Sequence, residues 1–523
     1  MTAEAFRDLL AQTREKSFLV ARRGIEKEGL RVSRDTHRIS QLEHPTALGS
    51  ALTHSAITTD YSEALLEFIT GVHDTPENAL EELFHLHAFT SQSLPNEIIW
   101  SASMPGELKG EADIPIAHYG SSNIGTMKRV YRNGLGARYG RAMQAIAGIH
   151  YNFSLPDAFW EQSLVQSKND RSIKEWRTEG YLALIRNFQR RLWLLNYLTG
   201  SSPAISRSFV SGQPAHLVAG EPETLLSNYA TSLRMGDLGY TSSAQDGLQI
   251  CYNQLTTYIQ TLTEAIVEPY EGYASLPATR DGEMLQLNQG LLQIENEFYS
   301  AIRPKRVTKS GEAPVRALDS RGIEYVEVRC LDVNPFTPLG IDVETTALVD
   351  AFLLSCLLED SPPCTPDSRK MDEENNKRAL NHGRDPSLRL LTEANGEQSL
   401  EEASQPILSS MMAAAELLDG ASNTARHTEA VNAAQARILG DQETPSARVI
   451  RELNEGQIDY SALMGQYSEQ WNQMFRETAI PQNIRTHLAD EAIASLRKQR
   501  EIEKSDTSTF EAFLQAFYSQ YRL

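Results

Sequence analysis

Residues 322–332 read GIEYVEVRCLD, and this stretch decides the class of fold. Its side chains alternate strictly: Val326, Val328 and Cys330 share one face, and Tyr325, Glu327 and Arg329 share the other. A period of two residues predicts a β-strand with one face on an apolar core and the other in a polar environment. Strands of this kind favour an antiparallel sheet, because parallel sheets are usually covered on both faces.

Two more segments alternate in the same way. Residues 146–155 (IAGIHYNFSL) put apolar side chains on one face and His150, Asn152 and Ser154 on the other. Residues 291–299 (LLQIENEFY) set Leu292, Ile294 and Phe298 against Gln293, Glu295, Glu297 and Tyr299. We therefore predict an α+β fold in which an open, mostly antiparallel sheet lines a cleft with polar groups.

The chain beyond about residue 340 has a different character. Residues 359–378 contain three prolines, which predicts an exposed connection and then a helix from about Met371 to His382 that ends at Gly383. Residues 399–437, 444–455 and 484–503 are rich in helix formers. We expect a sheet-bearing body over residues 1–340 and a mainly helical part over 341–523, packed on that body.

Composition limits the kind of partner. The chain has 49 Lys and Arg residues against 69 Asp and Glu residues, a formal net charge of −20, which argues against nucleic-acid and membrane binding. Its four cysteines form no Cys-x-x-Cys pair, which is typical of reduced thiols in the cytoplasm. The N-terminus lacks the apolar segment of a secretory signal, and no apolar run is long enough to span a bilayer. We expect a soluble cytoplasmic protein.

Several carboxylates have the spacing of metal ligands. In residues 22–32 (RRGIEKEGLRV), a strand would project Glu26 and Glu28 from one face, roughly 6–7 Å apart, which suits two neighbouring metal ions. The alternative is a solvated face on which they pair with nearby basic residues. Glu67, in residues 60–70 (DYSEALLEFIT), needs a partner or a metal if the segment is a strand. In a helix it would share a solvated stripe with Asp60.

Other polar residues are open to two interpretations. Glu327 and Arg329 form either a structural ion pair or a pair in which Glu binds a metal and Arg a phosphate oxygen. His150 is either a hydrogen-bonded structural residue or a ligand. Arg303 and Lys305, in the basic run RPKR, either bind nucleotide phosphates or lie in a solvated loop. The pairs Tyr131 with Arg132 and Arg234 with Tyr240 are suited to binding a small zwitterion.

Several familiar motifs are absent from the sequence. It has no Gly-x-x-x-x-Gly-Lys-Ser/Thr, no Gly-x-Gly-x-x-Gly, no Gly-x-Ser-x-Gly and no His-Glu-x-x-His. What remains is a set of carboxylates, one histidine and several arginines on strand faces. This set suits magnesium–nucleotide chemistry without a P-loop.

Seven segments, in order from about residue 20 to 340, also carry a family resemblance: RRGIEKEGLRV (22–32), HPTALGSALTHSAITTDYSEALLEFIT (44–70), IAHYGSSNIGTMKRVYRNGLGARYG (116–140), GIHYNFSLP (148–156), YATSLRMGDLGY (229–240), QIENEFYSAIRPKR (293–306) and GIEYVEVRCLDVNPF (322–336). Together they closely resemble the bacterial glutamate–cysteine ligase family, also called γ-glutamylcysteine synthetase. The resemblance implies the first step of glutathione biosynthesis, in which L-glutamate, L-cysteine and ATP give γ-glutamylcysteine, ADP and phosphate. It also implies a catalytic body similar to glutamine synthetase, with a curved sheet that forms a funnel.

The resemblance further implies a role for each matching residue. The expected ligands of two or three Mg²⁺ ions, for which Mn²⁺ would substitute, are Glu26, Glu28, Asp60, Glu67, His150 and Glu327. Arg329 and Arg132 would contact the transferred phosphoryl group. Tyr131, Arg234, Tyr240 and Tyr299 match positions around the cysteine site.

Two rival functions remain. The nearer one is an ATP-dependent ligase that joins glutamate to a different amine. The other is a non-catalytic binding protein on the same scaffold, which would be expected to lack one or more of the metal carboxylates. The expected partners are glutamate, cysteine and ATP, with no nucleic acid and no membrane, and the protein is expected to be a monomer.

Overall fold

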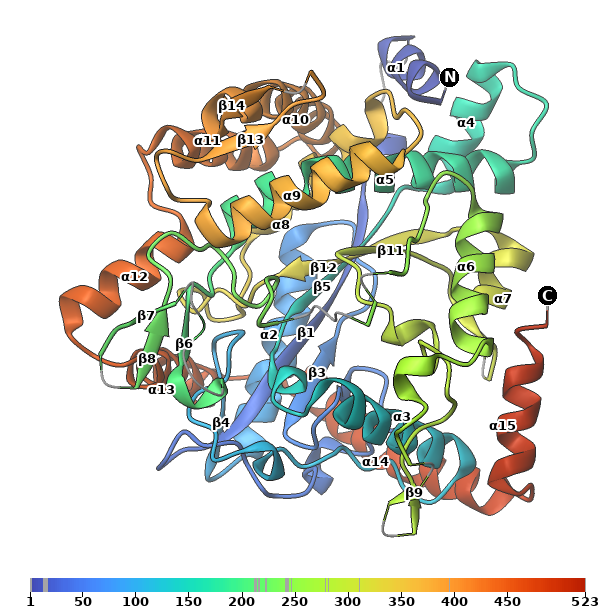
Figure 1. Ribbon diagram of the computed structural model, residues 1–523, viewed down its shortest axis with the longest axis vertical. Helices are drawn as coiled ribbons and strands as arrows, with labels where there is room; N and C mark the ends of the chain where they lie inside the picture. The colour runs from blue at the N-terminus through green and yellow to red at the C-terminus, as the bar shows by residue number, and fades with distance from the viewer. Residues whose placement is uncertain are drawn as a thin grey trace.

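The computed structural model describes residues 2–522 apart from 13–16, 211–213, 215–216, 222, 240–243, 246, 278, 281, 310 and 395. At its centre lies a seven-stranded sheet with the order β11-β12-β5-β1-β3-β2, in which β4 also pairs with β1 (Figure 1). The strands are β1 (Arg22–Ser33), β2 (Ile57–Thr59), β3 (Leu65–Ile69), β4 (Glu97–Ile99), β5 (Ile149–Ser154), β11 (Ile302–Lys305) and β12 (Tyr325–Leu331). Every pairing in this sheet is antiparallel, which confirms the expected sheet type.

The register of the central strands gathers the predicted polar residues. Glu26 on β1 lies opposite His150 on β5, and Glu28 lies opposite Glu67 on β3. Glu327 on β12 lies opposite Asn152 on β5. Glu67 is therefore a strand residue, and the helical alternative for its segment is wrong. Because cross-strand partners point to the same face, segments far apart in the sequence place their side chains together.

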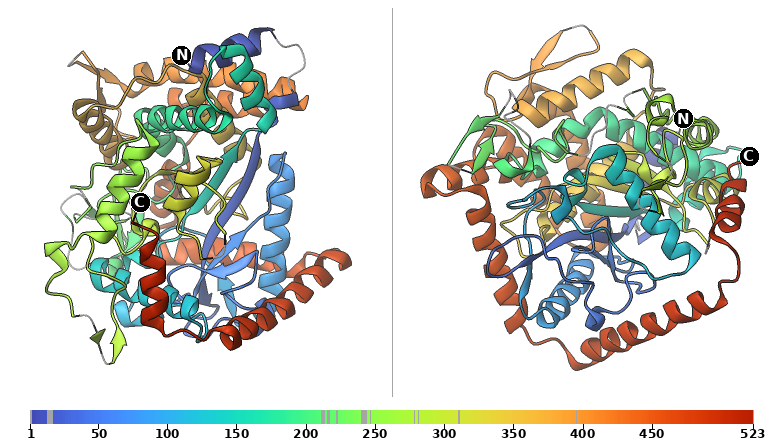
Figure 2. Two further views of the ribbon diagram at one scale, coloured as in Figure 1. Left: turned by 90° about the vertical axis from the view of Figure 1, so that its right-hand side faces the viewer. Right: turned by 60° about the horizontal axis from the view of Figure 1, so that its bottom comes forward.

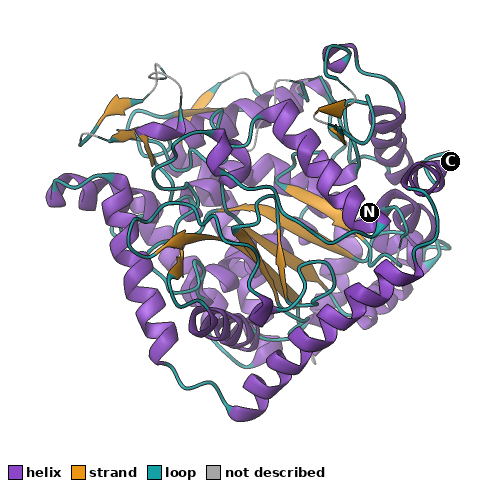
Figure 3. Cartoon of the chain, turned by 90° about the horizontal axis from the view of Figure 1, so that it is seen from below, coloured by secondary structure: helices purple, strands orange, loops and turns teal. Residues whose placement is uncertain are grey.

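Helices lie on both faces of this sheet. On one face, α2 (Pro76–Ser93) and α8 (Val343–Leu358) contact β1 through the pairs His87 with Lys27 and Asp350 with Arg23. On the opposite side lies α3 (Asn123–Tyr139), as the left panel of Figure 2 shows. Figure 3 shows the strands of the central sheet in the middle of the molecule, with helices around them.

The C-terminal part is mainly helical, as expected. The helix predicted from Met371 is α9 (Pro366–His382), which begins earlier because Thr365 caps it and Pro366 occupies its first turn. The stretch 399–437 forms two helices, α10 (Leu400–Ser422) and α11 (Arg426–Leu439), because the backbone of Asn423 is left-handed with φ 52°. The other helices here are α12 (Pro445–Gly456), α13 (Tyr460–Glu477), α14 (Gln482–Ser505) and α15 (Phe510–Ser519). The last of these helices wrap around the outside of the body (Figure 2, right).

The remaining elements are short or peripheral. The helices are α1 (Thr2–Gln12), α4 (Asp157–Ser167), α5 (Ile173–Thr199), α6 (Leu255–Val267) and α7 (Pro314–Arg321). Small sheets are formed by β6 (Ala204–Ser206), β7 (Val218–Ala219) and β8 (Thr224–Leu226), by β9 (Thr279–Arg280) with β10 (Glu283–Met284), and by β13 (Arg389–Leu391) with β14 (Glu397–Ser399). None of the described helices combines the length and apolar character needed to cross a bilayer.

The strand predicted over residues 291–299 is wrong. This segment is an irregular loop with one 3₁₀ turn, Glu295–Glu297, whose two glutamates are both buried. The backbone N–H of Gln293 donates to the carboxylate of Glu297, 2.7 Å away, rather than to a neighbouring strand. Local hydrogen bonds to buried side chains therefore replace the ladder that the alternating pattern predicts.

One hydrophobic cluster extends through both halves of the chain. It includes Ile149 on β5, Leu353 on α8 and Met411 on α10. The division into residues 1–340 and 341–523 stays a prediction.

Candidate active site

The centre of the candidate site is a group of acidic side chains around His150. Ligand atoms of Glu26, Glu67 and His150 lie within 4.8 Å of one another. The Nδ1 atom of His150 is 3.4 Å from Glu26 and 3.9 Å from Glu327, and its Nε2 atom is 3.7 Å from Glu28. Four strands thus bring four carboxylates and one imidazole to a single place. We call these five residues the acidic cluster.

Two basic residues border the cluster at Glu327. The Nζ atom of Lys305 and the Nη1 atom of Arg329 each lie 3.2 Å from its carboxylate oxygens. Burial opposes ionisation of Glu327, but Lys305 and Arg329 outweigh it and lower the pKa of this carboxyl well below its ordinary value. Glu327 is therefore ionised at neutral pH.

The other side chains in the cluster have shifted pKa values as well. Burial, with the charge of Asp60 nearby, raises the pKa of Glu28 to about 8, and burial with Glu26 nearby raises that of Glu67 well above normal. Burial and the charge of Arg329 lower the pKa of His150. A neutral imidazole beside carboxylates that are costly to ionise is an arrangement that a bound cation would stabilise.

Arg234 reaches the cluster from a loop. Its side chain is buried, and its Nη2 donates to the backbone oxygen of Arg329 at 2.9 Å. The guanidinium lies directly against Gly148, where a Cβ atom would come within 1.8 Å of Nη2. The N–H of Gly148 also donates to Glu28 at 2.6 Å. The glycine before β5 thus lets an arginine and a carboxylate approach the same peptide.

Asp60 and Arg132 meet at the end of β2. Asp60 directly follows the strand, and its charge acts on Glu28 and Glu67. Arg132, on α3, donates from Nε to the backbone oxygen of Asp60 and lies 4.6 Å above the ring of Tyr119. Arg132 contacts Asp60, Tyr119 and its own helix, and its expected role at the transferred phosphoryl group stays a prediction.

A cavity of about 590 Å³ opens beside the cluster. His150, Arg329, Arg234 and Tyr299 line it, together with residues of α9 such as Arg369. The hydroxyl of Tyr299 accepts a hydrogen bond from Gln144 at 3.0 Å. This size is within the range of small-molecule sites.

The remaining predicted residues lie outside the acidic cluster. Tyr131 lies on α3, and burial raises its pKa well above normal, so its hydroxyl is neutral. Arg303 is buried and donates to the backbone oxygens of Asn296 and Phe298. Its role at ATP phosphates stays a prediction, as does that of Lys305. Tyr240 lies outside the described residues.

The structure adds residues that sequence analysis did not assign. Asn152 donates to Glu26 at 2.8 Å, and it was visible only as a polar neighbour of His150 on its strand face. Lys128, four residues before Arg132 on α3, lies 4.9 Å above the ring of Tyr119, and burial lowers its pKa to about 8. In the sequence, only its position four residues before Arg132, which puts both side chains on one face of a helix, pointed to Lys128.

Carboxylates gathered beside a cavity can hold the cations that enzymes of phosphoryl transfer use to neutralise nucleotide phosphates. Comparison with known proteins gives the family. The sequence model of the glutamate–cysteine ligase family matches residues 6–379. Glutamate–cysteine ligases of Saccharophagus degradans and Pseudomonas putida W619 are each 46% identical, over 96% and 94% of this chain and 95% and 94% of their own lengths.

A solved structure agrees with these matches. The glutamate–cysteine ligase of Francisella tularensis in complex with AMP is 37% identical and superimposes with a TM-score of 0.90 over 95% of this chain and 97% of its own. The chain therefore belongs to the glutamate–cysteine ligase family. This confirms the expected family, the enzyme class and the ATP-dependent ligation of glutamate to cysteine. The monomeric state and the cytoplasmic location stay predictions.

Proposed function

We propose that the acidic cluster and the cavity beside it form γ-glutamylcysteine through a γ-glutamyl phosphate. A carboxylate resists attack by an amine, because its charge repels the nucleophile and oxide is a poor leaving group. Transfer of the γ-phosphoryl group of ATP to the γ-carboxylate of glutamate gives an acyl phosphate with a good leaving group. The amine of cysteine then attacks the acyl carbon, and phosphate departs.

The observation that carries this proposal is the contact between Glu327 and Arg329 at the edge of the cavity. Arg329 would donate to oxygens of the transferred phosphoryl group, where charge-assisted hydrogen bonds would stabilise the transition state. Arg132, with Lys305 and Arg303, would add positive charge along the ATP phosphates. In-line phosphoryl transfer needs such positioning more than it needs a protein nucleophile.

The acidic cluster, together with Asp60, would hold two or three Mg²⁺ ions, with Mn²⁺ as a substitute. Its donors are carboxylate oxygens and one imidazole nitrogen, held on rigid strands, and magnesium and manganese both prefer oxygen ligands. The residues that would hold the ions are Glu26, Glu28, Asp60, Glu67, His150 and Glu327. When bound, the ions neutralise phosphate charge.

The substrate amino acids would bind on the arginine and tyrosine side of the cavity. Arg234 is buried and positively charged, which suits a substrate carboxylate. Tyr131, Tyr240 and Tyr299 would surround cysteine with uncharged groups, and burial raises the pKa of Tyr299 above its ordinary value, which keeps its hydroxyl neutral. Such a pocket accepts a thiol without reacting with it.

Phosphate release tests this function directly. The purified chain is incubated with Mg-ATP and glutamate, and phosphate is measured with cysteine and with a panel of other amines. We expect release to depend on glutamate and to be fastest with cysteine. Equal rates with other amines would show that cysteine is not the preferred amine. Glu327→Gln is the matched variant: it should lower turnover sharply without unfolding the protein, and near-normal turnover would remove Glu327 from the site.

A further inference from the structure

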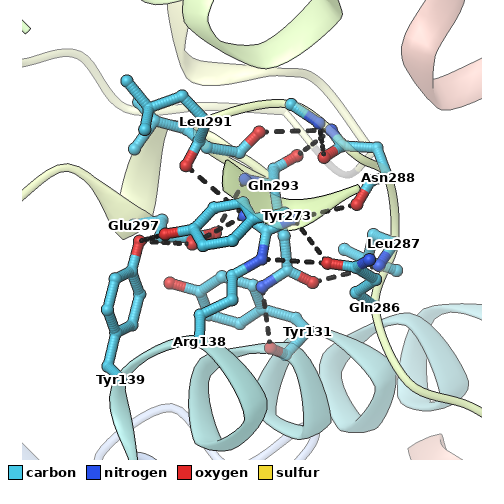
Figure 4. A network of polar contacts seen from close by, with 12 residues as sticks. Tyr131, Arg138, Tyr139, Tyr273, Gln286, Leu287, Asn288, Leu291, Gln293 and Glu297 are labelled. Carbon is cyan, nitrogen blue, oxygen red and sulfur yellow. Dashed lines mark hydrogen bonds and ion pairs between the residues drawn. The ribbon is translucent and has the colours of Figure 1, made fainter. Parts of the chain in front are cut away.

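A buried ion pair between Arg138 and Glu297 lies next to the expected cysteine pocket (Figure 4). The two side chains are 2.9 Å apart and fully buried, at 0% exposure each. Glu297 also accepts from the hydroxyl of Tyr139 at 2.8 Å and from the N–H of Gln293 at 2.7 Å. Arg138 lies 4.4 Å above the ring of Tyr273. Burying such a pair contributes little net stability, because desolvation offsets most of the attraction.

One set of contacts runs from this pair to Tyr131. The side chain of Gln293 donates from Nε2 to the backbone oxygen of Tyr131 at 3.1 Å, and its Oε1 accepts from the N–H of Leu287 at 3.0 Å. The amide group lies against α3 at Gly134, where a Cβ atom would come within 2.2 Å of Oε1. A glycine at this helix position therefore allows Gln293 to reach Tyr131.

A second set of contacts runs from the pair to Tyr299. The Nε2 atom of Gln245 donates to the backbone oxygen of Glu297 at 2.9 Å and to the hydroxyl of Tyr139 at 3.1 Å. Its Oε1 accepts from the N–H of Tyr299 at 3.1 Å. The rings of Tyr139 and Tyr299 meet edge to face, with centroids 5.6 Å apart. Gln245 and Tyr299 both line the cavity.

We propose that Glu297, held by Arg138, is a positioning residue that sets Tyr131 and Tyr299 for the cysteine substrate. The inference rests on the assignment of these tyrosines to the cysteine pocket under the proposed function. Glu297 lies too deep to touch substrate, and it acts through Gln293, Gln245 and Tyr139. The first set starts at the carboxylate of Glu297, which accepts from the N–H of Gln293. The second starts at the backbone oxygen of Glu297 and, through the hydroxyl of Tyr139, at the same carboxylate. One buried residue therefore links two tyrosines that belong to segments far apart in the sequence.

The test compares Michaelis constants for the three substrates. Glu297→Gln keeps the shape of the side chain and removes its charge, and we expect the KM for cysteine to rise about tenfold. The KM values for ATP and glutamate should stay within about twofold of the wild type, because the acidic cluster is untouched. A uniform rise in all three, or a loss of kcat alone, would overturn the proposal.

Two further variants cover the case in which Glu297→Gln does not fold. Gly134→Ala displaces Gln293 while placing a better helix former on α3, and Gln245→Leu breaks the link to Tyr299. Each should raise the KM for cysteine several-fold without lowering the melting temperature in proportion. Glu97→Gln is the matched control, because Glu97 forms an equally buried ion pair with Arg31, 2.7 Å away and outside the cavity. It should lower the melting temperature and leave all three KM values unchanged.

Tyr299→Phe distinguishes a wrong positioning role for Glu297 from a wrong assignment of the cysteine pocket. If Tyr299→Phe raises the KM for cysteine but Gly134→Ala and Gln245→Leu do not, the positioning role is wrong and the cysteine pocket stands. If Tyr299→Phe also leaves this KM unchanged, the pocket assignment and the positioning role are both wrong.

Discussion

The two faces of strands β1 and β5 differ in how their charges are balanced. On the face covered by α8, Arg23 lies 2.9 Å from Asp350, and the hydroxyl of Tyr151 donates to the same carboxylate at 2.7 Å. On the other face, Glu26 and His150 belong to an acidic cluster of four carboxylates. Among the described residues, Lys305 and Arg329 form ion pairs with Glu327 of that cluster.

The difference separates a structural network from a functional one. The Arg23–Asp350 pair is complete within the chain, since each charge has an opposite partner and a hydrogen bond. The acidic cluster has four carboxyl groups beside two basic partners, and burial together with mutual repulsion makes the ionisation of Glu28 and Glu67 unfavourable unless cations bind. A group of buried charges that the chain leaves unbalanced is therefore the better indicator of function.

The largest expected effect is a loss of stability on the sheet face covered by α8, where Arg23 pairs with Asp350. Asp350→Asn leaves Arg23 buried without its counter-charge, which should cost about 3–5 kcal/mol of unfolding free energy. Turnover per folded molecule should change little, because the cavity lies on the other side of the sheet. Urea unfolding and kcat, measured on the same preparation, check this. A large loss of kcat with unchanged stability would mean that the two faces are not separate in function.

The next largest effect is a loss of turnover on the sheet face that borders the cavity. Arg329→Ala removes a donor to the transferred phosphoryl group and should lower kcat by about 10²–10³. Stability should fall little, because the side chain borders a cavity rather than a packed core. Single-turnover phosphate release and thermal unfolding measure the two quantities. If stability falls while kcat holds, Arg329 is a structural partner of Glu327 and nothing more.

Much of this difference between the faces could be predicted from the sequence. The period-two pattern assigned His150 and Glu327 to polar strand faces, because alternation alone determines which face a strand residue occupies. The spacing of Glu26 and Glu28 predicted in the same way that, on a strand, they share one face. What spacing could not supply was register: that Glu28 lies opposite Glu67 depends on pairing between distant strands.

The wrong strand prediction for residues 291–299 has a physical cause as well. Residues 291–299 alternate like a strand, yet a buried ion pair between Glu297 and Arg138 fixes them as a loop. A pattern of polarity does not distinguish a glutamate on a solvated strand face from one that is buried and paired. The partner on α3 is about 160 positions away in the sequence, so no local signal reveals it.

The two faces should also respond to pH in opposite directions. The pKa of Glu28 is raised to about 8 in the folded chain. This group therefore favours the folded state fully at a pH below its pKa in the unfolded chain, and that contribution to the free energy of unfolding is lost as pH rises towards 8. The pKa of Asp350 is lowered: burial opposes the shift, and Arg23 outweighs burial. The contribution of Asp350 to the free energy of unfolding is therefore full at a pH above the ordinary pKa of an aspartate, and it is lost only in acid.

Mg²⁺ should remove the loss of stability that the titration of Glu28 causes as pH rises. Without Mg²⁺, the melting temperature should fall between pH 5 and 8, and Glu28→Gln should flatten that fall. Adding Mg²⁺ should stabilise the wild type by up to about 2.7 kcal/mol at 100 times its dissociation constant, and more at pH 8 than at pH 6. Calorimetric scans at several pH values give both quantities. Equal stabilisation at both pH values would show that Glu28 does not take part in cation binding.

The smallest expected effect concerns Lys305, which is partly exposed and lies 3.2 Å from Glu327. Lys305→Met removes a positive charge that competes with bound cations for the carboxylate. The free enzyme should therefore bind Mg²⁺ about two- to fivefold more tightly, whereas the KM for ATP should rise by a similar factor. Lys309→Met is the control, because Lys309 is exposed on the following loop, where its removal should change neither value. Opposite shifts for the metal and the nucleotide would show that Lys305 contributes positive charge to both sites, whereas weaker binding of both would mean that it holds the end of β11 in place.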